Sequence, residues 1–254
     1  PRSTLFPYTT LFRSIHFPFC ISKCPYCDFF SLPFNDKTIH SKYIEYLLKE
    51  IANYKPVLAD ELESLYFGGG TPSLIDPESL SIILDKFRIT DKTEITIEVN
   101  PATADYDKLR KFRELGINRL SIGSQAFING DLKTLGRSHN AESIYECFEN
   151  SRKAGFENIS IDLIIAVPGQ TAASAVYNAN EVITLCPEHV SAYILTYYDK
   201  TPYTKRLENG TITKLEDDTE IEFFELTAEI LEKHGLLKYE ISNFSKPGFE
   251  SKHN

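Results

Sequence analysis

The sequence contains no methionine and no tryptophan among its 254 residues, and it opens with Pro1. Because a natural reading frame begins with methionine, we expect the chain to be a fragment at its N-terminus at least. It has no run approaching the roughly 18 apolar residues of a membrane-spanning helix. Residues 1–14 also lack the continuous apolar stretch of a signal peptide. The sequence therefore predicts no membrane-spanning segment and a cytoplasmic location.

Basic residues are scarce, since 27 lysines and arginines stand against 36 aspartates and glutamates, for a net charge of −9. A protein that holds a nucleic-acid backbone needs a positive field, so this balance argues against nucleic acid as a partner. The 42% hydrophobic and 25% charged content is that of a globular protein and excludes a disordered chain. The length is sufficient for one large core or two small ones.

Cysteine is also sparse, with five residues in a chain that is too long to need disulfide staples. Three of them, Cys20, Cys24 and Cys27, fall within eight residues, which predicts ligands in a reducing compartment. The other two, Cys147 in a helical pattern and Cys186 before a proline, are interpreted as packing residues.

One order of elements repeats along the chain: a short β-branched or aromatic run, a turn with Gly, Pro or Asn, and an amphipathic helix. Asp76 is predicted to cap a helix that starts at Pro77, and Gly116 and Gly155 to follow helix ends. The pattern predicts strands at residues 15–19, 64–67, 94–99, 119–123, 159–166 and 189–196, and helices near 38–54, 77–87, 106–115, 141–154 and 171–184.

Strands of near-continuous apolar character that alternate with helices are typical of parallel β/α units. We therefore predict an α/β fold, a (β/α)6 partial TIM barrel. After the sixth strand the pattern changes to an acidic helix at 217–234, a strand-like run at 237–244 and a polar turn, and the chain stops at Asn254. Because no packing element follows this turn, we expect truncation at this end too.

Residues capable of chemistry follow the predicted strands, where this architecture places its active sites. The spacing Cys20-x-x-x-Cys24-x-x-Cys27 puts three thiolates in one loop after the first strand. They can bind three corners of an iron–sulfur cube and leave the fourth iron open. The alternative is a zinc site, whose fourth ligand would come from His16, His40 or Asp28.

Three consecutive glycines, Gly68 to Gly70, follow the second strand and precede Thr71 and Pro72. They would let a ligand approach the backbone, and their N–H groups can meet a carboxylate or phosphate. A flexible strand–helix turn is an equal alternative.

Four polar residues lie at or just after strands three to five: Glu98, Gln125, Arg137 and Asp162. A carboxylate near the end of an apolar strand, such as Asp162, is costly to bury alone, which indicates a ligand contact or a paired structural group. Arg137 is equally consistent with a solvated helix charge. His139, His189 and His234 are interpreted as structural or exposed.

Six motifs together resemble the branch of the radical S-adenosylmethionine (SAM) family that contains oxygen-independent coproporphyrinogen III oxidase, and within it the haem chaperones. They are the cysteine loop, Gly68-Gly69-Gly70-Thr71-Pro72-Ser73, Glu98-Val99-Asn100-Pro101, the run from Asn118 to Gln125, Leu135-Gly136-Arg137-x-His139, and Asp162-Leu163-Ile164 with Pro168-Gly169-Gln170-Thr171.

The resemblance implies a [4Fe-4S] cluster on Cys20, Cys24 and Cys27, with S-adenosylmethionine on the open iron. It further implies that Tyr26 contacts the adenine, and that the methionine end meets Gly69, Gly70 and Thr71. The ribose and the polar groups of methionine would be contacted by Glu98, Gln125, Arg137 and Asp162.

Two positions favour the haem chaperones within this branch. The oxidase is similar but has a further cysteine two residues after the third, where this chain has Phe29. The chaperones have a His-Asn-x-x-Tyr-Trp haem-binding segment, which would begin at the terminal His253-Asn254, so His253 is implied to contact haem.

The resemblance thus implies a protein that binds haem as cargo, passes it to apo-haemoproteins of the respiratory chain, and forms a homodimer. The alternative is a coproporphyrinogen III oxidase-type enzyme of porphyrin biosynthesis, so whether the chain is an enzyme stays open. A zinc-stabilised binding module is the third hypothesis. The expected division is a non-native leader at 1–14, in which Ser14 replaces a family tyrosine, a radical SAM core at 15–210, and the start of a truncated C-terminal region at 211–254.

Overall fold

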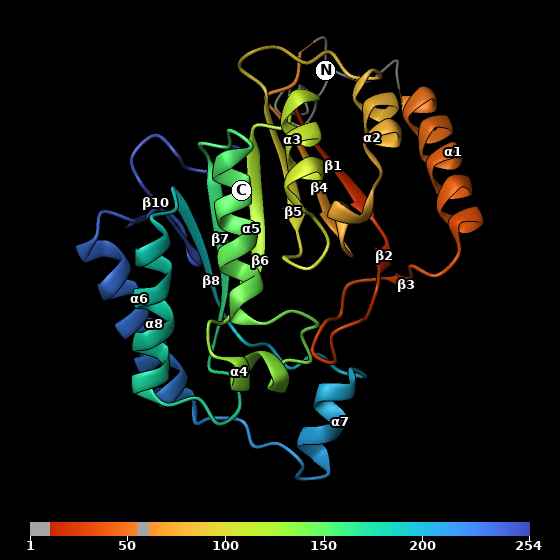
Figure 1. The fold of residues 1–254 in the computed structure, drawn as a ribbon. Helices are drawn as coiled ribbons and strands as arrows, with labels where there is room; N and C mark the ends of the chain where they lie inside the picture. Colours follow the sequence, from red (N-terminus) through yellow and green to blue (C-terminus); the bar gives the residue numbers. More distant parts are fainter. Residues whose placement is uncertain (1–10, 55–60) are drawn as a thin grey trace, which may run out of the picture.

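The computed structural model describes residues 11–54 and 61–254, which form one large sheet flanked by helices (Figure 1). The sheet has eight strands in the order β1-β4-β5-β6-β7-β8-β10-β9. Six neighbouring strands run parallel: β1 (Phe12–Phe17), β4 (Ser64–Gly69), β5 (Glu94–Val99), β6 (Arg119–Gln125), β7 (Ile159–Ile165) and β8 (His189–Ile194). The predicted α/β fold with six parallel β/α strands is confirmed.

Helices wrap around this sheet: α3 and α5 lie in front of the strands in Figure 1, α1 and α2 to one side, and α6 and α8 to the other. Their bounds are α1 (Lys37–Tyr54), α2 (Pro77–Leu84), α3 (Tyr106–Glu114), α5 (Ala141–Lys153), α6 (Ala172–Leu185) and α8 (Asp217–Lys233). The predicted helices thus all form, because each presents an apolar face to the strands.

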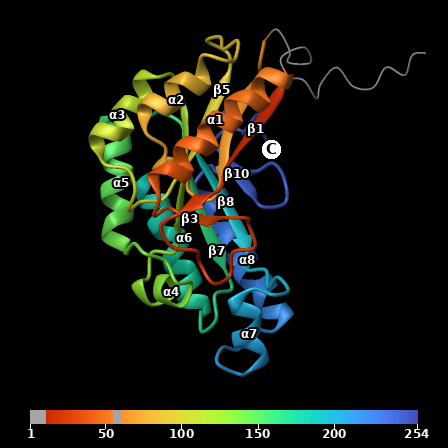
Figure 2. The same ribbon diagram turned by 90° about the vertical axis from the view of Figure 1, so that its right-hand side faces the viewer.

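Smaller elements that the sequence did not predict gather beyond the carboxyl ends of the parallel strands. They are the 3-10 helix η3 (Pro72–Leu74), the helices α4 (Asn129–Thr134) and α7 (Pro202–Glu208), and a two-stranded pair of β2 (Phe19–Cys20) with β3 (Leu32–Pro33). Figures 1 and 2 show α4, α7 and this pair at one end of the molecule. This is the end that the β/α architecture reserves for chemistry.

Core and cavity-lining residues largely alternate along the parallel strands, which corrects the expectation of near-continuous apolar strands. In β5, Ile95, Ile97 and Val99 are buried in the core, while Thr96 and Glu98 face the concave side of the sheet. The same two-residue period places a polar set on the concave face from the neighbouring strands: Tyr66, Arg119, Ser121, Gln125, Ser160, Asp162, His189, Ser191 and Tyr193. The sheet therefore has an apolar outer face under the helices and a polar inner face.

Local capping interactions explain where the helices begin. Asp76 accepts a hydrogen bond from the Ser79 N–H at 2.7 Å, with Pro77 in the first turn, as predicted. The two predicted end glycines have positive φ, 99° at Gly116 and 90° at Gly155, which favours glycine after a helix end.

The first predicted strand, 15–19, is misplaced. β1 begins at Phe12 because Phe12 to Ser14 pair in parallel with β4, and it ends at Phe17 because Pro18 has no N–H to donate. Of the predicted leader, residues 1–10 lie outside the described residues. The strand-like run 237–244 divides into β9 (Leu237–Lys238) and β10 (Asn243–Ser245), which pair antiparallel and extend the same sheet from β8.

Candidate functional site

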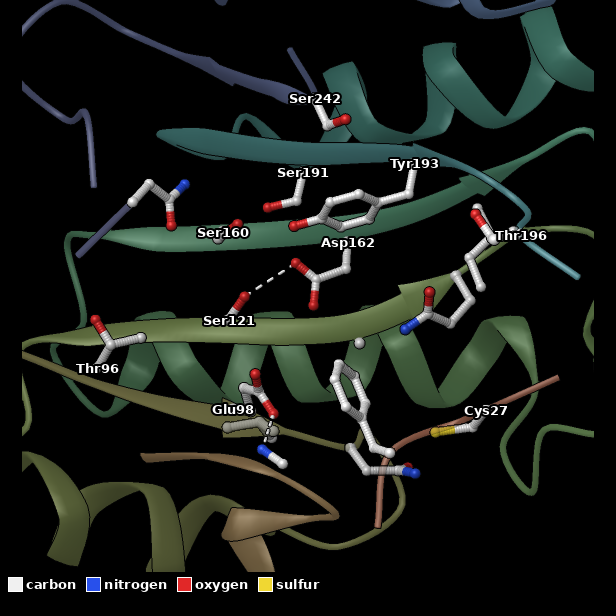
Figure 3. A pocket seen from close by; sticks show the side chains of 18 of the residues that line it. Cys27, Thr96, Glu98, Ser121, Ser160, Asp162, Ser191, Tyr193, Thr196 and Ser242 are labelled. Carbon is white, nitrogen blue, oxygen red and sulfur yellow. Dashed lines mark hydrogen bonds between the residues drawn. The ribbon is translucent and has the colours of Figure 1, made fainter. Parts of the chain in front are cut away.

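The concave face of the sheet holds a cavity of about 850 Å³ that runs from the cysteine loop to the first residues of the parallel strands. Figure 3 shows polar side chains from several strands directed into it. Nine of the predicted site residues line this cavity: Tyr26, Cys27, Gly69, Gly70, Thr71, Glu98, Gln125, Arg137 and Asp162. The structure thus brings together residues that the chain spreads over more than a hundred positions.

The cysteine loop follows β2, and all three of its cysteines are free and partly buried. A turn closes between the second and third, because the Cys27 N–H donates to the Cys24 carbonyl at 3.1 Å. Among the described residues, no three His, Cys, Asp or Glu side chains converge on one point as ligands of a single ion. An iron–sulfur cube does not require such convergence, because each thiolate binds a different iron.

Arg137 lies against this loop. Its Nη1 donates to the Cys24 Sγ at 3.5 Å and its Nη2 to the Gly123 carbonyl at 2.8 Å, while its buried Nε has no partner in the part of the chain that the structure describes. Arg137 is therefore a partly buried residue of the cavity wall in contact with the cysteine loop, and not a solvated helix charge.

The glycine run is needed for packing between strands. A Cβ on Gly70 would lie 2.7 Å from the Phe19 carbonyl and 2.8 Å from the Phe17 carbonyl. The Gly70 N–H donates to the Phe17 carbonyl at 2.8 Å, and the Gly69 N–H, at a φ of 111°, donates to the Glu98 Oε2 at 3.1 Å. Two of the three glycine N–H groups thus have partners within the chain. Neither a flexible strand–helix turn nor a cradle of free N–H groups describes the glycine run completely.

Two carboxylates, Glu98 on β5 and Asp162 on β7, project toward the same space in Figure 3. Glu98 accepts hydrogen bonds from the Tyr66 hydroxyl at 2.9 Å and from Gly69, and Asp162 accepts one from Ser121 at 2.9 Å. Within the described part of the chain, neither forms an ion pair with a basic side chain.

Desolvation inside the barrel raises the pKa of Glu98, and desolvation together with the charge of Glu98 raises the pKa of Asp162 to about 7. Buried carboxylates without a cation are costly, which indicates that a cationic ligand or a set of hydroxyl donors meets them here.

Gln125 reaches the cavity through a backbone irregularity. The register between β6 and β7 shifts between Ile122 and Gln125, and Gln125 itself has a φ of 70°. Such a bulge re-aims a side chain at the end of a strand.

His253 lies away from the cysteine loop. Its Nε2 is 2.7 Å from the Ser14 Oγ, its Nδ1 is 2.8 Å from the Ser64 Oγ, and its ring stacks on Tyr66 at 4.8 Å. Ser64 is the first residue of β4, whereas the cysteines follow the opposite ends of the strands. Both ring nitrogens therefore have hydrogen-bond partners in this arrangement, and contact with haem stays a prediction.

Sequence reasoning missed the opposite end of the cavity, which we call the floor: Thr96, Arg119, Ser160, His189 and Asn254. His189 is structural there, as expected: its Nδ1 bonds Ser160 and its Nε2 bonds the Tyr239 hydroxyl, both at 2.8 Å. Burial and the nearby Arg119 lower its pKa to about 2. The alternation of polar residues in Glu94-Ile95-Thr96-Ile97-Glu98 is the signal that would have revealed this surface.

The two remaining cysteines differ from one another. Cys147 is buried, as expected for a packing residue. Cys186 is exposed, which corrects its interpretation as a packing residue: it ends α6 in a left-handed conformation, with a φ of 53°.

Comparison with known proteins identifies the family. A family model described as "Radical SAM superfamily" matches residues 14–177. The chain belongs to the radical SAM superfamily. This family implies a [4Fe-4S] cluster and S-adenosylmethionine as cofactors. The residues present fit both: three free thiols in one loop, one of them in contact with Arg137, and two carboxylates in the same cavity that form no ion pair with a basic side chain of the described residues.

Curated relatives named "Heme chaperone HemW" are similar over most of the chain. The Lactococcus lactis protein is 36% identical over 243 residues, which cover 94% of this chain and 63% of the relative. The Bacillus subtilis protein is 35% identical over 246 residues, which cover 65% of it. This radical SAM chain is thus HemW-like and spans less than two thirds of these relatives.

Among solved structures, coproporphyrinogen III oxidase (HemN) from Escherichia coli superposes with a TM-score of 0.84 at 25% identity, covering 93% of this chain and 56% of that chain. The radical SAM fold is confirmed by this neighbour. In the described part of this chain, no helix is long and apolar enough to cross a membrane.

Replacing Gly70 by alanine is expected to lower the free energy of unfolding by about 1–3 kcal/mol, because the added Cβ meets the backbone of Phe17 and Phe19. Gly130→Ala is the matched control, since its Cβ would have nothing nearer than Ile128 at 3.8 Å. Urea denaturation of both variants measures the difference. A Gly70→Ala chain as stable as the wild type would contradict the packing role.

The raised pKa of Asp162 predicts that stability declines with rising pH. The folded carboxyl titrates at about 7 and the unfolded one near 3.8, so the folded state binds more protons between these values. The contribution of Asp162 to stability is fully present below the pKa of its carboxyl in the unfolded chain, and it is lost as the pH rises through the pKa of that carboxyl in the folded chain. We expect the Tm to fall from about pH 5 to pH 8, and Asp162→Asn to flatten this decline.

Thermal unfolding across this pH range tests the assignment, with the exposed Asp199→Asn as control. Glu98, whose pKa is also raised, would leave a residual slope of the same sign. An Asp162→Asn profile identical to that of the wild type would rule out Asp162 as the source.

Proposed function

We propose that this chain is the cofactor-binding core of a haem chaperone, a cytoplasmic protein that binds haem and delivers it to apo-haemoproteins of the respiratory chain, and that it forms a homodimer. Phe29 is the observation on which this rests, since it stands where the similar oxidase has a further cysteine. The relatives named as haem chaperones support the proposal. In this proposal, residues 15–210 form the core and residues 211–254 begin a further region.

Phe29 has a second feature that suits haem. It lines the cavity and is 65% exposed, and Tyr193, Tyr198 and Ile241 are exposed side chains that line the same cavity. An apolar rim around a polar interior favours a flat amphipathic ligand, because a macrocycle can cover the rim while polar substituents enter the cavity. His253 is the proposed haem ligand and would have to leave Ser14 and Ser64 to bind.

The cofactors are proposed to bind at the cysteine end of the cavity. Cys20, Cys24 and Cys27 would hold the cluster, with Arg137 donating a hydrogen bond to the Cys24 sulfur. When bound and reduced, the cluster supplies the electron that cleaves the sulfonium of S-adenosylmethionine. The proposed contacts of S-adenosylmethionine are Tyr26, Gly69, Gly70, Thr71, Glu98, Gln125, Arg137 and Asp162.

The protein's own residues would orient this cofactor. Glu98 and Asp162 offer carboxylate oxygens to cationic and hydroxyl groups, and neither forms an ion pair with a basic side chain of the described residues. The ring of Tyr26 packs edge-on against Tyr203 at 6.3 Å, which fixes it at the cavity wall.

The second candidate is an enzyme of the coproporphyrinogen III oxidase type. It is favoured by the close superposition on that oxidase. The two functions share the cofactor site and a tetrapyrrole ligand, and they differ in whether a propionate side chain is decarboxylated.

Cluster binding is tested by anaerobic reconstitution of the chain with iron and sulfide. We expect about four irons and four sulfides per chain with a broad brown absorbance, and their loss in Cys20→Ala, Cys24→Ala and Cys27→Ala. Cys186→Ala is the control, because this exposed thiol lies outside the loop. A colourless, zinc-loaded wild type would instead support the zinc-stabilised module.

Haem binding and catalysis are separated by two measurements on the reconstituted chain. Absorbance titration with haem is expected to saturate at one haem per chain and to change its spectrum in His253→Ala. Incubation with coproporphyrinogen III, S-adenosylmethionine and a reductant is expected to yield no vinyl product. Vinyl product would favour the oxidase, and failure of the wild type to bind haem would sink the chaperone proposal.

A further inference from the structure

We infer that the floor of the cavity is a second ligand subsite, in which Arg119 binds a carboxylate of the molecule that occupies the cavity. The identity of the ligand rests on the proposed function, under which that carboxylate is a propionate of haem or of a porphyrin. The subsite lies at the opposite end of the parallel strands from the cysteines.

Arg119 is a buried cation without an anion. Its side chain lines the cavity and the residue is only 2% exposed, yet it forms no ion pair with any carboxylate of the described residues. Its Nη1 donates to the Asn158 Oδ1 at 2.8 Å and to the Phe249 carbonyl at 3.3 Å. Both acceptors are neutral, and the guanidinium acts on the Asp162 carboxyl without forming an ion pair with it, so no anion of the described residues contacts Arg119, which is costly inside a protein.

Thr96 provides an independent sign of a missing partner. It pairs directly with Arg119 in the register between β5 and β6, so the two side chains emerge side by side on the concave face. Its hydroxyl is buried and has no hydrogen-bond partner within residues 11–54 and 61–254. A guanidinium that no anion contacts, beside an unpartnered hydroxyl donor, forms a site for a carboxylate, which accepts from both.

The surrounding groups leave this position to a ligand. His189 is neutral and uses both nitrogens on Ser160 and Tyr239. The Oε1 of Glu94 accepts the Lys252 N–H at 3.1 Å and the Ser251 hydroxyl at 3.5 Å. Asp162 bonds Ser121, so neither nearby carboxylate pairs with Arg119.

The floor is too deep for the group that the cysteine loop would hold. Six residue steps separate Arg119 from Gln125 along β6, or about 20 Å of extended strand. Both residues line one continuous cavity, so a molecule entering at the exposed rim of Phe29 and Tyr193 can extend down to Arg119. A flat ligand with carboxylates at one edge fits this path.

The subsite is tested without haem by the effect of glutarate on thermal unfolding of the full chain. We expect saturating glutarate to raise the Tm of the wild type by about 2–4 °C and to leave Arg119→Gln unchanged. Arg152→Gln is the matched control, since Arg152 pairs with Glu188 at 2.8 Å outside the cavity and should keep the response. No shift in the wild type, or an equal shift in Arg119→Gln, would overturn the proposal.

Should Arg119→Gln fail to fold, as judged by circular dichroism, Arg119→Lys takes its place. Lysine retains the charge but not the bidentate geometry of the guanidinium. We therefore expect a folded chain whose apparent affinity for glutarate is at least threefold weaker than that of the wild type. A response in Arg119→Lys as strong as in the wild type would count against the proposal.

The source of the carboxylate is identified by titration with haem and with haem dimethyl ester. Arg119→Gln should weaken haem binding at least tenfold and leave binding of the ester unchanged. Equal loss for both ligands would exclude a propionate contact. If glutarate stabilises the wild type alone while haem does not bind at all, the proposed function fails and the carboxylate subsite stands.

Discussion

The two-residue period of the parallel strands is the constraint on which the rest of this structure depends. Because successive side chains point to opposite faces, one set (Ile95, Ile97, Val99) builds the core under the helices and the other (Thr96, Glu98) builds the cavity wall. A shift of one residue in β5 would put Glu98 under the helices and isoleucines into the cavity. The fold and the site are therefore specified by the same pattern, and neither can be altered alone.

The architecture was predictable because its signals are local. The β5 boundaries agree with the sequence prediction, since turns mark both ends, and Asp76 and Pro77 announce the start of α2. The start of β1 was not predictable, because it depends on pairing with β4, far along the chain. The glycine run was only half understood for the same reason: the atoms that forbid a Cβ at Gly70 belong to Phe17 and Phe19, fifty residues earlier.

The candidate site, like the fold, was only partly predictable from the sequence. The cysteine loop and the residues at strand ends could be found from spacing, because parallel strands bring their carboxyl ends together. The floor could be found only in part: the alternation of polar residues in β5 marks Thr96, but the closure of the floor depends on the C-terminal residues folding back under the barrel. There Ser251 and Lys252 donate to Glu94, and His253 bonds Ser14 and Ser64. These contacts join residues more than 150 positions apart, and no local pattern encodes them.

The unpaired ionisable groups of the cavity give it a direction. The carboxyls of Glu98 and Asp162 lie between the cysteine loop and the floor, while Arg119 places its positive charge at the floor. A chain that needed only stability would pair these groups, since an isolated buried charge costs more than an ion pair or an apolar residue. Kept apart along one wall, they favour a cationic molecule at one end and an anionic group at the other. One ligand with a cationic end and an anionic end can then bind in only one orientation. Two different ligands of opposite charge would each bind at one end of the cavity.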